Sequence, residues 1–188
     1  MNKLLVCILC LASSLVKAEN KLVSAAKERL NHFIIYDGSY ESIPYPNGDV
    51  HKNKGVCTDV IIRSYRTLGI DLQQLVHEDM KANFDEYPNN WGLKKPDSNI
   101  DHRRVPNLEK FFQRKGKSLV VSKNSSDYQP GDLVTWLVSN NLPHIGIVSN
   151  IKSSRDSNRY KIIHNIGLGP KLDDMLFNYK IVGHFSYK

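Results

Sequence analysis

Apolar residues in the first part of the chain recur at the three- and four-residue spacing of amphipathic helices. This spacing predicts helices over residues 19–35, 71–80 and 107–115, with Phe84 as the outer limit of the second. A further helix is predicted with Cys57 in its first turn and its end at Gly69, because glycine commonly closes a helix. Asp71 stands where the N-terminal cap of the next helix is expected.

From Ser118 onwards the pattern changes to short runs rich in β-branched residues, which are typical of strands. Strands are predicted over residues 118–121, 133–138, 144–149, 160–166 and 179–187, and a helical turn over 172–177. Because the connections are short, neighbouring strands are expected to run antiparallel. The pattern therefore predicts an α+β protein, with N-terminal helices packed on an antiparallel sheet of four or five strands.

The first 18 residues have the pattern of a secretory signal peptide. Lys3 precedes an apolar run, and Ala18 closes a Val-Lys-Ala triplet that suits signal peptidase. The run is shorter than the roughly 20 apolar residues that a spanning helix needs. We therefore expect export to the periplasm or the medium without stable membrane insertion, and a single domain over residues 19–188.

Removal of this segment changes the cysteine count and the charge. Cys7 and Cys10 are lost, so Cys57 is the one cysteine left in the mature chain. The loss of Lys3 and Lys17 lowers the formal charge from +7 to +5. The dispersed positive charge fits an anionic polymer of a bacterial envelope as partner. Nucleic acid is not expected, because the sequence has an export signal and no aromatic-basic motif.

Cys57 is a candidate nucleophile, because the first turn of a helix favours a thiolate over a thiol. The alternative is a small buried core residue. His144 opens one predicted strand and His164 lies near the end of the next, so antiparallel pairing would bring them together as base and orienter. Asn165 is the alternative orienter. A zinc site made of Cys57, His144, His164 and Asp59 is the rival hypothesis, although the sequence has no short-spaced ligand pair.

Several segments carry a resemblance to known families. The stretches PGDLVTW at 130–136, LPHIGIV at 142–148 and IIHN at 162–165 resemble the strand half of NlpC-type papain-like cysteine hydrolases. Residues 22–187 more closely resemble a bacterial family of exported proteins of unassigned function, through GVCTD at 55–59, NIDHRR at 99–104 and HNIG at 164–167. The chain departs from the NlpC-type pattern at Val56, where aspartate is usual, and in a long insert over 71–117.

The resemblance implies a papain-like (NlpC-type) fold without cofactor or metal. It also implies a nucleophile at Cys57, a base at His144 and an orienter at His164. The expected activity is that of an exported cysteine amidase or peptidase that cleaves amide bonds of peptidoglycan peptides. A non-catalytic module that grips such peptides is the alternative, and a zinc-dependent hydrolase is a weaker one.

Six further residues are candidates for substrate binding. Tyr45 and Trp91 could line a cleft, or could pack against the core. The polar run at 101–104 could bind a carboxylate or phosphate through its arginines, or could contain a buried pair that pins the insert against the sheet. The full candidate set is Tyr45, Asp59, Trp91, Asp101, His102 and Arg103.

Overall fold

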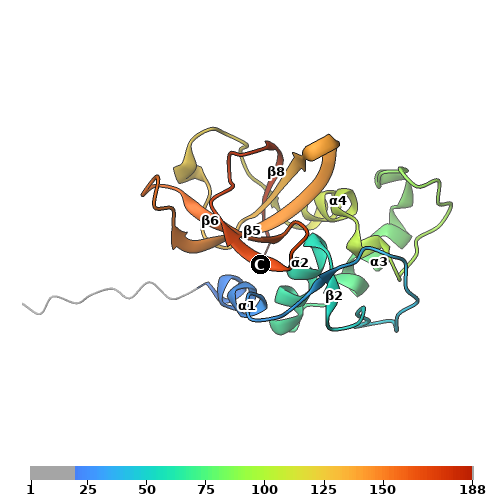
Figure 1. The fold of residues 1–188 in the computed structure, drawn as a ribbon. Helices are drawn as coiled ribbons and strands as arrows, with labels where there is room; N and C mark the ends of the chain where they lie inside the picture. The colour runs from blue at the N-terminus through green and yellow to red at the C-terminus, as the bar shows by residue number, and fades with distance from the viewer. Residues whose placement is uncertain (1–19, 188) are drawn as a thin grey trace, which may run out of the picture.

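The computed structural model describes residues 20–187 and has an α+β fold, which confirms the predicted class (Figure 1). The predicted signal peptide, residues 1–18, lies outside the described residues. The helices are α1 (Lys21–Arg29), α2 (Cys57–Thr67), α3 (Leu72–Ala82) and α4 (Val105–Lys115). No helix within residues 20–187 is long and apolar enough to cross a membrane.

Six antiparallel strands form the main sheet, one more than the upper limit expected from the sequence. In spatial order they are β3 (Lys117–Ser118), β8 (Lys180–Ser186), β4 (Leu133–Val138), β5 (Leu142–Lys152), β6 (Tyr160–Asn165) and β7 (Pro170–Asp173). A separate parallel pair joins β1 (Ile35–Tyr36) to β2 (Lys54–Gly55) directly before α2. Four short 3₁₀ turns connect these elements, at Phe84–Glu86, Asp101–Arg103, Ser125–Asp127 and Ser139–Asn141.

The helix ends follow local chemistry. Asn20 accepts the backbone N–H groups of Leu22 and Val23 at the start of α1, and Asp71 accepts that of Gln73 at the start of α3. Gly69 has φ +76° just beyond α2, a left-handed conformation that glycine adopts without a Cβ clash. The predicted cap at Asp71 and the predicted stop at Gly69 are therefore confirmed.

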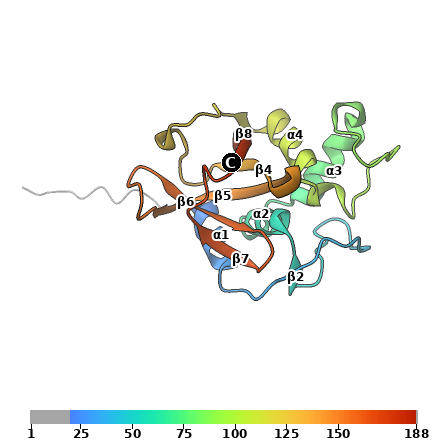
Figure 2. The ribbon, with the colours of Figure 1, turned by 45° about the horizontal axis from the view of Figure 1, so that its top comes forward.

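The helices share one face of the sheet. Apolar residues of all four helices pack with the inward side chains Leu133, Ile145, Ile147, Ile163 and Phe185. The opposite face carries Trp136 and Val148 and is covered by loop residues such as Tyr128 and Leu176. Figures 1 and 2 show α2 at the centre of the molecule, against the sheet and among the other helices. The N-terminus of α2 is thereby held against β5.

Three predicted elements are wrong in extent or type. The first helix ends at Arg29 instead of residue 35, and Phe33, expected on its buried side, is 80% exposed. The chain leaves the helix there so that Ile35 and Tyr36 can pair with β2. The strand expected over 118–121 stops at Ser118, and beyond it the carbonyl of Val120 accepts a hydrogen bond from the His184 ring.

The helical turn expected over 172–177 is instead strand β7 followed by a turn. A proline opens β7, which is compatible with a strand because β7 lies at the sheet edge and pairs on one side only. This strand proves important, because it brings an acidic residue to the histidines described below.

Candidate functional site: Cys57 and a histidine pair

Cys57 is the first residue of α2, as predicted from the glycine turn and the apolar run that follows. The carboxylate of Asp59 accepts the backbone N–H of Val56 at 2.6 Å and so closes the N-terminus of the helix. The cysteine side chain is 4% exposed and packs in the core beside Ile145 of β5. Cys57 is therefore a core residue, as the alternative prediction had it, and it also stands at the helix start expected of a nucleophile.

The thiol is held neutral. Burial raises the pKa of Cys57 to about 11, while hydrogen bonds from backbone N–H groups, first that of Ile145, act in the opposite direction. The negative charge of Asp59 raises this pKa further. The helix N-terminus therefore supplies the N–H groups expected of it, but they do not outweigh the loss of solvation.

The two predicted histidines meet on neighbouring strands. Nε2 of His144 lies 3.0 Å from Nδ1 of His164, with the two rings nearly perpendicular. His164 in turn places its Nε2 3.1 Å from Oδ2 of Asp173 on β7. Both rings are buried, and desolvation lowers both pKa values, that of His144 to about 3. One tautomer set satisfies the series: Nε2–H of His144 donates to His164, and Nε2–H of His164 donates to Asp173.

Asn165, the alternative orienter, points elsewhere. Strand alternation sends its side chain to the face opposite His164, where its amide donates to the carbonyl of Gly55 at 3.5 Å. The structure thus places His164, rather than Asn165, against His144. The sequence pattern does not predict the role of Asp173, because this residue lies on β7, in the segment predicted to be a helical turn.

The link between cysteine and histidine passes through the backbone. The N–H that contacts the thiol belongs to Ile145, the residue directly after His144. Among the hydrogen bonds of residues 20–187, none joins the thiol to the imidazole ring of His144. Since Nε2 of His144 is engaged with His164, Nδ1 is the ring nitrogen left for a proton exchange with Cys57.

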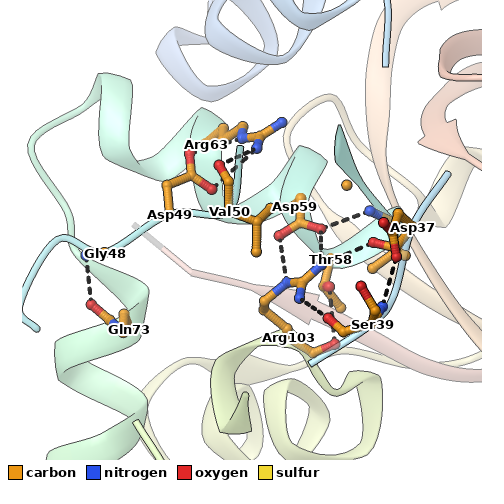
Figure 3. Close-up of polar contacts among 12 residues, drawn as sticks. Asp37, Ser39, Gly48, Asp49, Val50, Thr58, Asp59, Arg63, Gln73 and Arg103 are labelled. Carbon is orange, nitrogen blue, oxygen red and sulfur yellow. Dashed lines mark hydrogen bonds and ion pairs between the residues drawn. The ribbon is translucent and has the colours of Figure 1, made fainter. Parts of the chain in front are cut away.

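A buried ion pair fixes the start of α2 (Figure 3). Arg103 donates from Nε to Oδ1 and from Nη2 to Oδ2 of Asp59, both at 3.0 Å. The same guanidinium donates to the carbonyls of Asp37 and Ser39, and Thr58 donates its hydroxyl to the carbonyl of Arg103. Two residues predicted to bind substrate therefore bind each other and tie the loop before β2 to the helix that carries Cys57.

The neighbouring polar residues are also internal. Asp101 is buried, accepts the backbone N–H of Asp97, and pairs with Arg104 at 3.4 Å. Burial lowers the pKa of His102 to about 3, and its Nδ1 has no hydrogen-bond partner among the residues that the structure describes. Of the two readings of the 101–104 run, a buried pair holding the insert agrees with these contacts, although the partner of Arg103 is Asp59 on α2.

The aromatic candidates lie at the surface. Tyr45 and Trp91 are each 42% exposed. Tyr45 packs edge-on against His77 of α3, and Trp91 lies under the guanidinium of Arg104 at 4.0 Å. Trp91 also lines a hollow of about 310 Å³ that reaches Val56, next to Cys57. Trp91 is thus near the cysteine turn, whereas the structure gives Tyr45 no contact with it.

The four residues of the rival zinc hypothesis do not form a metal site in the part of the chain that the structure describes. Within residues 20–187 no three side chains of His, Cys, Asp or Glu converge in a way that could hold a metal ion. Asp59, the fourth ligand of that hypothesis, is directed to Arg103.

Fold and site together define an α+β protein with a buried cysteine at a helix start and a histidine pair on the adjoining strands. Residues 23–187 match the model of a family described as a domain of unknown function, DUF1287. The chain is also 51% identical over 166 residues to the uncharacterized protein YijF of Escherichia coli (strain K12), covering 88% of this chain and 80% of that protein. The chain therefore belongs to the DUF1287 family.

Proposed function

We propose that this protein is an exported cysteine amidase or peptidase of the NlpC-type papain-like class. The observation that carries the proposal is the hydrogen-bonded series His144–His164–Asp173, which begins one residue from the N–H that contacts the Cys57 thiol. A base oriented by a second polar group, next to a nucleophile at a helix start, is the arrangement that acyl transfer needs.

The proposed reaction forms and hydrolyses a thioester. Cys57 attacks the amide carbonyl as its proton passes to Nδ1 of His144, and the backbone N–H of Cys57 stabilises the oxyanion. The imidazolium then protonates the leaving amine. Water gives a proton to His144 and attacks the thioester, which releases the acid and restores the thiol. His164, held by Asp173, fixes the tautomer of His144 throughout.

The proposed substrates are peptidoglycan peptides, and the proposed location is the periplasm or the medium. Support comes from the signal-like residues 1–18 and from the resemblance of the three strand motifs to NlpC-type enzymes. The positive net charge of +7, or +5 without the signal, agrees with attraction to an anionic envelope polymer.

A binding module without catalysis is the second candidate. It is favoured by the 4% exposure of Cys57 and by the rise of its pKa to about 11, both of which oppose a reactive thiolate in the free protein. In an amidase, the contact between thiol and base would have to tighten when substrate binds, as catalytic contacts commonly do.

Cys57→Ser separates the two candidates. The hydroxyl is close to the thiol in size but far less nucleophilic, so an amidase loses hydrolysis while peptide binding remains. A module without catalysis releases no fragment from peptidoglycan in either form. Release that is equal for wild type and variant would exclude the cysteine mechanism.

A further inference from the structure

We propose that the cavity between α1 and α2 binds a carboxylate of the substrate peptide through the side chain of Arg29. This inference rests on the proposed function and names the chemistry of one substrate group. The cavity has a volume of about 330 Å³. Its ionisable lining is mostly basic and consists of Arg29, His32, Lys52, Arg63, Arg66, Asp49 and Asp59.

The two carboxylates of this lining are already engaged. Asp49 accepts from Arg63 at 2.9 and 3.1 Å and from Arg66 at 2.8 Å, so one carboxylate serves two guanidinium groups (Figure 3 shows the Arg63 contacts). Asp59 is paired with Arg103. The charge of this cavity is therefore positive.

Within residues 20–187, Arg29 and Lys52 are the cations of this cavity without a hydrogen bond or ion pair, and Arg29 is the less exposed of the two. Among residues 20–187 its side chain makes no hydrogen bond and no ion pair, and its Nε is buried and unsatisfied. The Nε of Arg66, across the same cavity, is also buried and unsatisfied. Burial lowers the pKa of Arg29, as expected for a guanidinium removed from water. The charges of Glu28 and Asp49 act in the opposite direction, and that of Arg63 lowers this pKa further. An anion entering the cavity would supply the missing acceptor.

The position of the cavity connects it to the cysteine. Gly55, Val56 and Asn165 also line it, and Gly55 and Val56 lead directly into Cys57. A carboxylate bound at Arg29 would therefore place the rest of a peptide at the turn before the nucleophile. A guanidinium fork suits a planar carboxylate, which is the anionic group that a peptide substrate carries.

The experiment measures binding in the Cys57→Ser background, where no turnover occurs. The probes are N-acetylglutamate, its uncharged diamide and inorganic phosphate, titrated by calorimetry. We expect that N-acetylglutamate is the one probe of the three that binds saturably. Arg29→Gln should weaken this binding at least tenfold. Arg29→Lys, which keeps the charge and removes the fork, should weaken it less. Lys21→Gln, an exposed change on the same helix, is the matched control and should leave binding unchanged.

Three results would overturn the subsite: N-acetylglutamate affinity unchanged in a folded Arg29→Gln protein, equal binding of the diamide, or tighter binding of phosphate. Circular dichroism establishes that each variant is folded. The two proposals fail separately, because hydrolysis of peptidoglycan that survives Cys57→Ser refutes the cysteine mechanism. An affinity for the carboxylate that is unchanged by Arg29→Gln refutes only the subsite.

Discussion

Asp59 and Arg103 are 44 residues apart in the chain and form a two-point ion pair with both side chains almost fully buried. Asp59 is also the residue that closes the N-terminus of α2, two positions after Cys57. The pair thereby couples the long insert to the turn that presents the cysteine.

Replacement of Asp59 by asparagine should destabilise the fold strongly. The change leaves the Arg103 guanidinium buried without its counter-charge, which costs about 3–5 kcal/mol for a pair of this kind. Urea unfolding followed by circular dichroism measures the loss as a lower midpoint at unchanged slope.

Glu86→Gln is the control for that measurement, because it removes an exposed pair with Lys110 at 3.8 Å. We expect a change within about 0.5 kcal/mol there. Equal losses in the free energy of unfolding for Asp59→Asn and Glu86→Gln would show that the buried Asp59–Arg103 pair stabilises the fold no more than an exposed pair.

The histidine series predicts a graded loss of activity. His144→Gln should lower kcat by about 10²–10⁴-fold, the usual contribution of a general base. His164→Gln should cost about 10- to 100-fold, because the base is then present but poorly oriented. Asp173→Asn should cost least, since its side chain is 40% exposed and water can replace it at His164.

A positioning role for His164 and Asp173 requires a readout beyond the loss of rate. Each of the two variants should lower kcat while KM stays within about twofold, because substrate binding is not their task. Rates that fall equally at all three positions, or an effect confined to KM, would contradict the predicted order.

The free thiol should react slowly at neutral pH. Burial raises the pKa of Cys57 to about 11, so the thiolate fraction is small below about pH 9 and grows towards pH 11. Iodoacetamide rates measured between pH 6 and 10, with the modified peptide located by mass spectrometry, test this. A rate plateau reached below pH 8 would instead indicate a thiolate–imidazolium pair with His144 in the free protein.

Acid should destabilise the protein through its buried histidines. Desolvation lowers the pKa of both His102 and His144 to about 3, from 6.5. Below pH 6.5 the unfolded chain takes up these protons and the folded chain does not, so stability present above pH 6.5 is lost as the pH falls towards 3. Each histidine contributes at most about 1.4 kcal/mol per pH unit.

Urea midpoints between pH 7 and 4.5 measure this slope. His102→Gln should flatten it, whereas the same change at the exposed His51 should not. A slope that is unaffected by His102→Gln would show that this histidine does not remain neutral in the folded state.

The architecture could be predicted where local chemistry decides it. Gly69 marks the end of α2 and Asp71 the start of α3, as predicted. The strand predicted from the β-branched run at 133–138 has the same limits as β4. β7 could not be predicted, because a proline at its start is acceptable only at a sheet edge, which is a property of the tertiary arrangement. The length of α1 is likewise set by the later pairing of β1 with β2.

The histidine pair could be predicted from strand alternation, which allows only one of His164 and Asn165 to face His144. The partner of Arg103 could not be predicted, because Asp101 is much closer to it along the chain than Asp59, its actual partner. The role of Asp173 could not be predicted either, because it depends on β7. The burial of Cys57 shows why a helix N-terminus alone does not establish a reactive thiol: desolvation opposes it.

The most direct test of the central claim is mass spectrometry of purified peptidoglycan incubated with the wild-type protein and with Cys57→Ser. The cysteine hydrolase account predicts new peptide fragments with the wild-type protein and none with Cys57→Ser. The masses of the two fragments from one cleaved bond sum to the mass of the intact peptide plus one water. Fragments that appear equally with both proteins, or with neither, would contradict this account.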